Sequence, residues 1–551
     1  MKHRVSEDPE PADGGATQQR GISRRTLLAT GAASAVVGAG LGVGGTVLAR
    51  SHRPGPALWQ RPDRAGAPPV RGLHLQFGQN ASTQVVVSWH TTDAVRNPRV
   101  MVGAPGSGFG RTVPAETRTY RDAKSNTEVR VNHAVLDNLT PDTDYVYAAV
   151  HDGASPELGT ARTAPLGRKP LCFTSFGDQA TPTLGRLVGT TYASDNLGSP
   201  AAGDITAAVE RIGPLFNLVN GDLCYANLAR DRVRTWTDWF DNNTRSARHR
   251  PWMPAAGNHE NELGNGPVGY AAYQTYFALP DSGSDPQFRG LWYSFTAGSL
   301  RVISLNNDDV CFQDGGNFYI HGYSGGAQKR WLEAELANAR HDPEIDWIVV
   351  CMHQTAISTT NRTNGADLGI RQEWLPLFDR YQVDLVVCGH EHHYERSHPV
   401  RGVLGGDTRT PIPVDTRTDV VDTTRGTVHL VIGGGGTSAP SNKLFFAQPR
   451  CRVLTGVGGF DAAIGRKAPI YLTEEAPWSA FRDRENPYGF AAFEVDPGAP
   501  GGTTSIKVTH YAVGGPPVHS ASSTSSPSPD RVAASGAAAK VPRPQGNPSR
   551  H

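Results

Sequence analysis

Several residue patterns that define common classes of protein are missing from this sequence. None of its six cysteines takes the CxxC spacing of a zinc knuckle, and Cys172, Cys351 and Cys388 lie in apolar stretches typical of buried thiols. The sequence does not decide whether Cys311 and Cys451 form a disulfide. The formal net charge is only +1, without a run of Lys and Arg, so nucleic acid is not an expected partner.

One uncharged stretch near the N-terminus predicts where the protein resides. Residues 26–49 carry no charge and follow the paired Arg24 and Arg25, which is the form of a twin-arginine export signal behind a polar, disordered leader. A permanent membrane anchor is the alternative, although the many glycines make a poor spanning helix. We expect export to an extracellular, periplasmic or cell-envelope location, with membrane contact only through this segment if it stays uncleaved.

The remaining chain predicts two folded domains after a Pro- and Arg-rich linker at 50–68. Residues 69–165 alternate like the strands of a small all-β sandwich, and Tyr145 and Tyr147 lie in a stretch similar to the tyrosine corner of fibronectin type III domains. We expect this domain to be a structural spacer. From 170 to 513 apolar strands alternate with helical stripes, which predicts an α/β domain with sheets flanked by helices.

Two segments of this second half are predicted to lack regular secondary structure. Residues 399–425 are polar and predict a loop insertion. The Ser-, Pro- and Ala-rich segment 514–551 has little apolar surface to bury, so we expect a disordered tail.

Side chains of the types that bind metals follow five predicted strands of the α/β domain. The strands are predicted at 172–176, 215–219, 252–256, 347–351 and 385–388. The side chains that follow them are, in order, Asp178, Asp222 with Tyr225, Asn258 with His259, His353, and His390 with His392. Open α/β sheets place their chemistry at the carboxyl ends of strands, and a preceding glycine permits the tight turn that directs the side chain. The pattern therefore predicts one shared site.

These residue types favour a site with two metal ions. A carboxylate has two oxygens, so Asp222 can bridge two cations, and pairs of ions about 3.5–4 Å apart are a recurring solution for phosphoryl chemistry. Mixed oxygen and nitrogen ligands suit Zn, Mn or Fe better than Ca or Mg. The absence of cysteine from the set argues against a structural zinc site.

The five motifs together resemble the ordered blocks of the purple acid phosphatases, plant-type two-domain members of the calcineurin-like metallophosphoesterases. The motifs are Gly177-Asp178, Gly221-Asp222-x-x-Tyr225, Gly257-Asn258-His259-Glu260, Val350-x-x-His353 and Gly389-His390-x-His392. The resemblance implies a ferric ion on Asp178, Tyr225 and His392. It implies a divalent second ion (Zn, Fe or Mn) on Asn258, His353 and His390. Asp222 would bridge the two ions.

The same resemblance implies an acid phosphatase that cleaves small phosphate monoesters by attack of a metal-bound hydroxide. His259 would contact the phosphate or donate a proton to the leaving oxygen, and Asn258 would lie beside the substrate. The family's substrate loop carries further histidines soon after the block of His353, whereas this chain has Thr359-Thr360-Asn361-Arg362 there. Arg362 can replace them as a phosphate ligand or remain a solvated loop residue.

Two alternative functions remain open at this point. A phosphodiesterase or phospholipase can use the same metal pair, and a cell-surface binding protein can carry an inactive site. The polar run at 306–309 follows a predicted strand and is assigned to turn chemistry. His393 is expected to be a hydrogen-bonded structural residue.

Overall fold

The computed structural model describes residues 66–183, 186–188, 191–193, 195, 197–313, 319–462, 466–499, 502–514 and 525–536. The predicted export signal and nearly all of the linker lie outside these residues. Within them, no helix is both long enough and apolar enough to cross a membrane.

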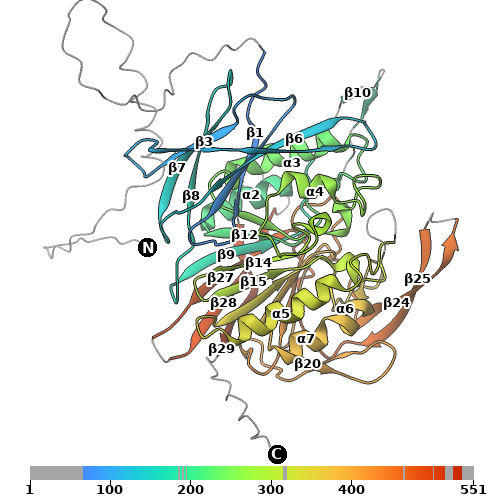
Figure 1. Ribbon diagram of the computed structural model, residues 1–551. Coiled ribbons are helices and arrows are strands. Elements are labelled where there is room, and N and C mark those ends of the chain that lie inside the picture. The colour runs from blue at the N-terminus through green and yellow to red at the C-terminus, as the bar shows by residue number, and fades with distance from the viewer. Residues whose placement is uncertain are drawn as a thin grey trace, which may run out of the picture. The chain divides into compact units, whose positions relative to one another are not determined.

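The N-terminal domain is a β-sandwich of two four-stranded antiparallel sheets (Figure 1). One sheet has the order β1 (Arg71–Phe77), β2 (Val85–Thr91), β6 (Glu128–Leu136), β5 (Glu116–Arg121), and the other β4 (Arg111–Pro114), β3 (Arg99–Gly103), β7 (Asp144–Val150), β8 (Glu157–Arg162). The Tyr145 hydroxyl accepts a hydrogen bond from the Thr140 backbone N–H at 2.8 Å. This is the geometry of the predicted tyrosine corner.

The second domain contains two seven-stranded sheets. The first has the order β13 (Trp252–Pro254), β12 (Phe216–Val219), β9 (Leu171–Phe176), β27 (Gly489–Asp496), β28 (Thr504–Val513), β29 (Ser525–Gly536), β22 (Val420–Asp422). The second has the order β14 (Tyr293–Ala297), β15 (Leu300–Ser304), β16 (Trp347–Cys351), β18 (Leu385–Cys388), β23 (Val428–Ile432), β19 (Tyr394–Ser397), β26 (Ser479–Arg482). Phe216 and Phe295 join the sheets, with ring centroids 5.3 Å apart.

Helices cover these sheets, as the alternating pattern predicts. Helix α2 (Ala201–Ile212) packs on β27 and β28, and α5 (Ala327–His341) packs on β16 (Figure 1). The predicted stripes are buried at Ile205 and Val209 in α2 and at Leu332 and Leu336 in α5. The α/β sandwich with flanking helices is confirmed.

The sandwich and the second domain share a tightly packed boundary. Strand β1 packs on α3 (Arg232–Ala247), and α4 (Ala271–Tyr276) packs on β2, β5 and β6. His74 and His133 bond the backbone carbonyls of Tyr276 and Thr275 through Nε2, both at 2.9 Å. Polar side chains that would face water in an isolated sandwich are therefore buried and paired here.

Two predictions of irregular structure are wrong. The segment predicted as a loop insertion at 399–425 contains the strands β20 (Val400–Val403), β21 (Pro411–Pro413) and β22. The predicted disordered tail contains β29, which pairs antiparallel with β28. Strand β29 pairs through backbone N–H and C=O groups, so it does not require the apolar side chains that are few in its segment. In the other segment, the scattered Val400 and Val421 supply buried apolar side chains to β20 and β22.

All six cysteines are unpaired, and five of them are buried. Cys311 and Cys451, left open as a disulfide, are both free. Cys351 and Cys388 lie in β16 and β18, as expected for thiols that pack as small apolar side chains.

Candidate metal centre

Side chains from all five predicted motifs converge just after the carboxyl ends of five strands. Strands β9, β12 and β13 run parallel to one another in one sheet, and β16 and β18 run parallel in the other. Parallel neighbours end at the same edge, so the residues that follow them meet there. Asp178, Asp222, Asn258, His353 and His390 are all buried at this meeting point.

One group of donor atoms consists of Asp178, Tyr225 and His392. The Tyr225 hydroxyl lies 3.0 Å from Asp178 Oδ1 and 3.1 Å from His392 Nε2. His392 Nε2 lies 3.4 Å from the same carboxylate oxygen. His392 Nδ1 donates to the Ala439 carbonyl at 2.6 Å, which leaves Nε2 as the free nitrogen. The structure thus brings together the three residues predicted for the ferric ion.

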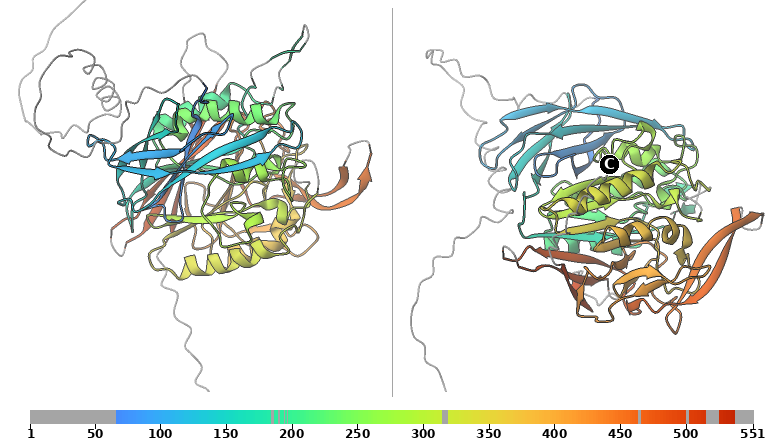
Figure 2. Two further views of the ribbon diagram at one scale, coloured as in Figure 1. Left: turned by 45° about the horizontal axis from the view of Figure 1, so that its top comes forward. Right: turned by 60° about the horizontal axis from the view of Figure 1, so that its bottom comes forward.

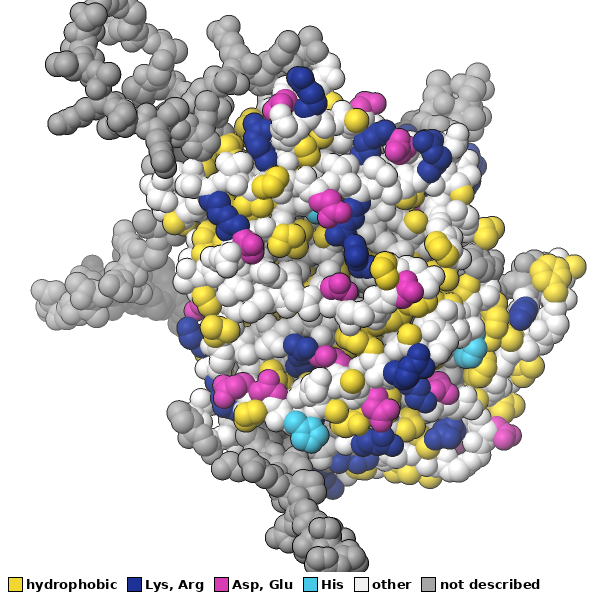
Figure 3. Space-filling model, in the orientation of Figure 1, with side chains coloured by type: hydrophobic (Ala, Val, Ile, Leu, Met, Phe, Trp, Pro, Cys, Tyr) yellow, Lys and Arg dark blue, Asp and Glu magenta, His cyan; other side chains and the backbone are white. Residues whose placement is uncertain are grey.

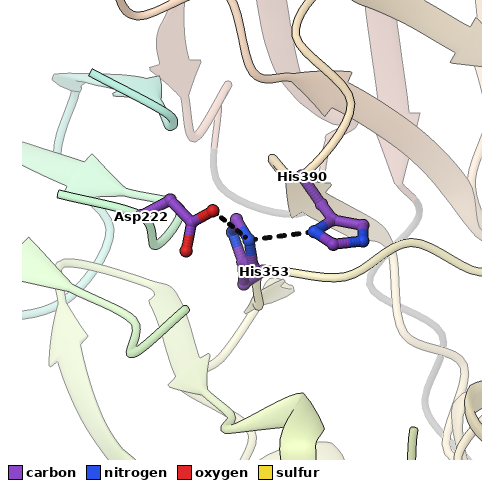
Figure 4. Close-up of side chains that lie close together, drawn as sticks. All are labelled: Asp222, His353 and His390. Carbon is purple, nitrogen blue, oxygen red and sulfur yellow. Dashed lines mark hydrogen bonds and ion pairs between the residues drawn. The ribbon is translucent and has the colours of Figure 1, made fainter. Parts of the chain in front are cut away.

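The second group consists of Asp222, Asn258, His353 and His390, three of which are drawn in Figure 4. His353 Nε2 lies 3.0 Å from Asp222 Oδ2, 2.9 Å from Asn258 Oδ1 and 3.1 Å from His390 Nδ1. These residues come from four different strand ends. Their donor atoms lie around a common point.

The outer hydrogen bonds of the two histidines show that this point suits a cation. His353 Nδ1 bonds the Asn220 carbonyl at 2.7 Å, and His390 Nε2 bonds Gln313 Oε1 at 2.6 Å. Because these partners accept, each histidine carries a proton on its outer nitrogen, and its inner nitrogen is the one that can ligate a cation. Two imidazole nitrogens, a carboxylate and an amide oxygen then face one point, an arrangement that a metal ion stabilises.

The pKa shifts of the site also favour a bound cation. Burial lowers the pKa of His353, but the Asp222 carboxylate outweighs it and raises the pKa to about 10. Burial raises the pKa of Tyr225 well above its usual value, and the charges of Asp178 and Asp222 raise it further. The site therefore favours positive charge. A bound cation reverses the effect on Tyr225, because it stabilises the phenolate.

Four of the predicted ligands hold an unusual backbone conformation. Asp178, Asp222, Tyr225 and His390 have φ values of 56°, 50°, 60° and 70°. This left-handed region is costly for residues other than glycine and is found where surrounding contacts enforce it, often at functional sites. The fold thus maintains strain at the positions that direct these side chains inward.

The glycines before the ligands mainly provide room, which differs from the predicted role in turns. Of these glycines, Gly221 alone has a left-handed φ, 77°. A Cβ atom on Gly257 would lie 2.3 Å from Asp222 Oδ1, and one on Gly389 would lie 2.3 Å from Asp178 Oδ2. Neighbouring motifs therefore pack so closely that the ligand carboxylates lie against bare backbone.

Several residues position the ligands through hydrogen bonds, although the sequence predicted no role for them. Asn307, in the run predicted as a turn, accepts hydrogen bonds from the His353 and Gln354 N–H groups through Oδ1, at 2.7 and 3.1 Å. Glu260 accepts from the Asp222, Leu223 and Gly257 N–H groups, each at 2.8 Å. Their signal in the sequence is weak, because a polar residue beside a motif has many ordinary explanations.

The loop after His353 contains no substitute histidine. Thr359 and Thr360 turn inward, where their hydroxyls donate to Glu395 and Glu391. Arg362 is exposed and has no hydrogen-bond or ion-pair partner among the described residues. His393 bonds the Ser441 hydroxyl at 2.8 Å, in keeping with the structural role expected for it.

Two family profiles match the chain. The N-terminal domain of purple acid phosphatases matches residues 70–163, and the calcineurin-like phosphoesterase domain matches 194–394. Together they account for more than half of the 551 residues and place the sandwich before the metal-binding domain. This chain belongs to the purple acid phosphatase family.

Relatives of this purple acid phosphatase include bacterial and plant proteins. An uncharacterized protein of Mycobacterium tuberculosis is 77% identical over 508 residues, covering 92% of this chain and 95% of the relative. The purple acid phosphatase of Glycine max is 27% identical over 377 residues, covering 66% and 72%. A relative from Arabidopsis thaliana, named Fe(3+)-Zn(2+) purple acid phosphatase 12, is 25% identical over 66% of this chain and 72% of its own length.

A solved structure supports the fold. Purple acid phosphatase from yellow lupin seeds superposes with a TM-score of 0.60 at 18% identity, covering 85% of this chain and 75% of the lupin chain. The family is one of metal-dependent phosphoesterases, and the two donor groups give this member a dinuclear type of site. Asp178 precedes the matched phosphoesterase residues, so its place in the site comes from the geometry alone.

We predict that Gly257→Ala weakens metal binding, because the new Cβ displaces the Asp222 carboxylate. The expected result is a metal content reduced by about half or more at equal protein concentration, since supporting residues of metal sites affect affinity by about 10–100-fold. Elemental analysis of the purified protein measures it. Gly110→Ala is the matched control, because a Cβ there meets nothing within 4 Å. Full metal occupancy in Gly257→Ala would contradict the packing argument.

Proposed function

We propose that this purple acid phosphatase is an exported acid phosphatase that hydrolyses small phosphate monoesters. The observation that carries the proposal is the pair of adjacent donor groups, one with a phenol and the other with an amide and two imidazoles. Such a pair fits two ions of different character. Our assignment is a ferric ion for the group of Tyr225 and a zinc, iron or manganese ion for the group of His353.

Asp222 is proposed as the bridging ligand. Its carboxylate lies 3.0 Å from His353 Nε2 in one group, and its charge also raises the pKa of Tyr225 in the other. When bound, the two ions supply Lewis acidity to the phosphate oxygens and make a water nucleophilic near neutral pH. The Tyr225 phenol and the Asp222 carboxylate hold negative charge where those ions require it.

His259 is proposed to act on the substrate. Its Nδ1 bonds Asn227 Oδ1 at 2.9 Å, and its Nε2 lies 4.0 Å from Asp222 Oδ2. With the outer nitrogen occupied, Nε2 is the atom that can hold a phosphate oxygen or donate a proton to the leaving oxygen. Asn258 lies beside it, and the exposed Arg362 is free to bind a phosphate from solvent.

A comparison of two esters of one alcohol tests the activity. We expect the metal-loaded protein to hydrolyse phenyl phosphate at least about tenfold faster than diphenyl phosphate, because the second ester group must also fit the site. The rate should fall as the pH rises from acidic toward neutral, because burial lowers the pKa of His259 and its protonated form is then lost. Phenol release measures both rates. A faster diester would favour a phosphodiesterase, and inactivity with bound metal would favour a binding protein.

A separate prediction concerns the ferric ion. A phenolate on ferric iron absorbs visible light by charge transfer, so Tyr225→Phe should bleach the colour of the oxidised, iron-loaded protein. Tyr273→Phe is the matched control, since Tyr273 is also buried but donates its hydroxyl to the Pro254 carbonyl, away from the donor groups. The measurement is the visible spectrum of the wild type, Tyr225→Phe and Tyr273→Phe at equal iron content. An unchanged band in Tyr225→Phe would exclude this residue as the ligand.

Export is proposed on the sequence alone, because Arg24 and Arg25 lie outside the described residues. Replacing both by Lys keeps the charge and should block a twin-arginine route. Immunoblots of the cytoplasm and of the fractions outside it measure the distribution. Normal amounts of the double variant outside the cytoplasm would refute the proposal, and a variant in the mature region, such as Gly110→Ala, controls for expression.

A further inference from the structure

A run of four glycines follows strand β23 and crosses between the two large sheets. Residues 433–436 come directly after β23, which belongs to the second sheet. The Gly435 N–H donates to the Gly177 carbonyl at 2.9 Å, and the Gly434 carbonyl accepts from the Gly489 N–H at 3.0 Å. Gly177 follows β9 and Gly489 begins β27, and both of these strands belong to the first sheet. The run therefore lies at the strand ends where the ligands converge.

Two glycines of the run lie so close to the ligand motifs that a side chain would not fit. A Cβ atom on Gly433 would lie 2.2 Å from the Glu391 carbonyl oxygen and 2.7 Å from Asp178 Oδ2. A Cβ atom on Gly435 would lie 2.2 Å from the Gly177 carbonyl oxygen. Non-bonded carbon atoms prefer a separation of about 3.5–4.0 Å, so these contacts are much too short. Glycine at both positions lets the run pack directly against two ligand motifs.

The chain after the run holds two ligands of the first donor group. The Thr437 N–H donates to the Asp178 carbonyl at 3.0 Å. The Ala439 carbonyl accepts a hydrogen bond from His392 Nδ1 at 2.6 Å, and the Ser441 N–H donates to the His392 carbonyl at 2.9 Å. One segment therefore contacts two of the three side chains that are proposed to hold the ferric ion.

Other parts of the chain hold the second donor group. His353 Nδ1 bonds the Asn220 carbonyl at 2.7 Å, and His390 Nε2 bonds Gln313 Oε1 at 2.6 Å. The two groups touch where Asp178 Oδ2 accepts the His390 backbone N–H at 2.8 Å, a bond that does not involve the imidazole ring. The supports behind the two sets of donors are therefore largely separate.

We propose that residues 433–441 form a positioning segment that determines whether the ion of Asp178 and His392 binds, and that they leave the ion of His353 unaffected. This inference rests on the proposed function, which assigns one ion to each donor group. Metal affinity depends on how closely the donors are held to the required geometry, and residues behind the ligands commonly change it about 10–100-fold. The positioning segment supplies such support to two donors of one ion at once.

Gly435→Ala tests this role, because the new Cβ displaces the backbone that precedes Asp178. We expect the variant to bind the ferric ion at least about tenfold more weakly and the second ion with unchanged affinity. Each protein is loaded with ferric iron and zinc and dialysed. Elemental analysis then gives iron and zinc per chain, and the visible band reports iron at Tyr225. Retained zinc shows in the same sample that the variant is folded.

Gly434→Ala is the matched control within the run. A Cβ atom on Gly434 lies nearest to the Pro487 carbonyl oxygen, at 3.1 Å, and so on the side of β27 rather than of the ligand motifs. This variant should keep both ions. An iron loss as large as that of Gly435→Ala would overturn the inference, because any methyl group added to the run would then disturb the site.

A remote control lies in the hairpin formed by β24 (Arg450–Asp461) and β25 (Arg466–Glu475). The hairpin extends away from the two large sheets in both views of Figure 2, and Figure 3 shows it protruding from the molecule. Among the described residues, a Cβ atom on Gly459 meets nothing within 4 Å. Gly459→Ala should therefore bind both ions as the wild type does. Equal iron loss in Gly459→Ala and Gly435→Ala would contradict a local role of the run.

If Gly435→Ala does not fold, Ala439→Gly decides. The Ala439 side chain is exposed, so its removal leaves the core intact. Glycine gives more conformational freedom to the backbone whose carbonyl holds His392, and we expect iron to bind about threefold more weakly. Unchanged iron binding, or equal weakening of iron and zinc, would then overturn the inference.

The outcome for the positioning segment can be told apart from that for the function. A colourless wild type that binds two zinc ions, one of which is lost in Gly435→Ala, would retain the positioning segment and refute the ferric assignment. A coloured wild type that hydrolyses phenyl phosphate, together with an equally coloured Gly435→Ala, would refute the positioning segment alone.

Discussion

The site depends on holding oxygen and nitrogen donors of opposite sheets about 3 Å apart in the protein interior. Burial removes the hydration of these groups, which a bound cation can replace. The fold holds the donors in place with hydrogen bonds behind each histidine, left-handed backbone at four ligands, and glycines that let the motifs touch. A bound metal would replace the lost hydration, so the free energy of metal binding would also stabilise the fold.

The sequence could predict the strands and the residues that follow them, because both are local signals. Strands β16 and β18 have the predicted bounds, and the α/β pattern is confirmed. The supporting residues could not be predicted in the same way. Gln313 accepts a hydrogen bond from His390, 77 positions away, and Asn307 accepts one from the backbone of His353, 46 positions away. No periodicity or composition encodes such a contact.

The departures from prediction share a physical origin. Strand β29 and the hairpin β24–β25 arise mainly from backbone pairing, for which residue type is a weak guide. The buried outer face of β1 arises from packing on α3, which lies some 160 positions further along the chain. The sandwich, interpreted from the sequence as a spacer, is joined to the second domain by these buried contacts as one packed body.

The unpaired cysteines have a consequence for how the chain can fold. Burial raises the pKa of Cys172 to about 11 and those of Cys388 and Cys451 to about 12. The thiolate is the form that attacks a disulfide, and its population at neutral pH is then negligible. No covalent cross-link is needed to reach the native state among the six thiols, which are all described. Folding of the described residues therefore requires no oxidation of thiols, and packing and hydrogen bonds hold the architecture together.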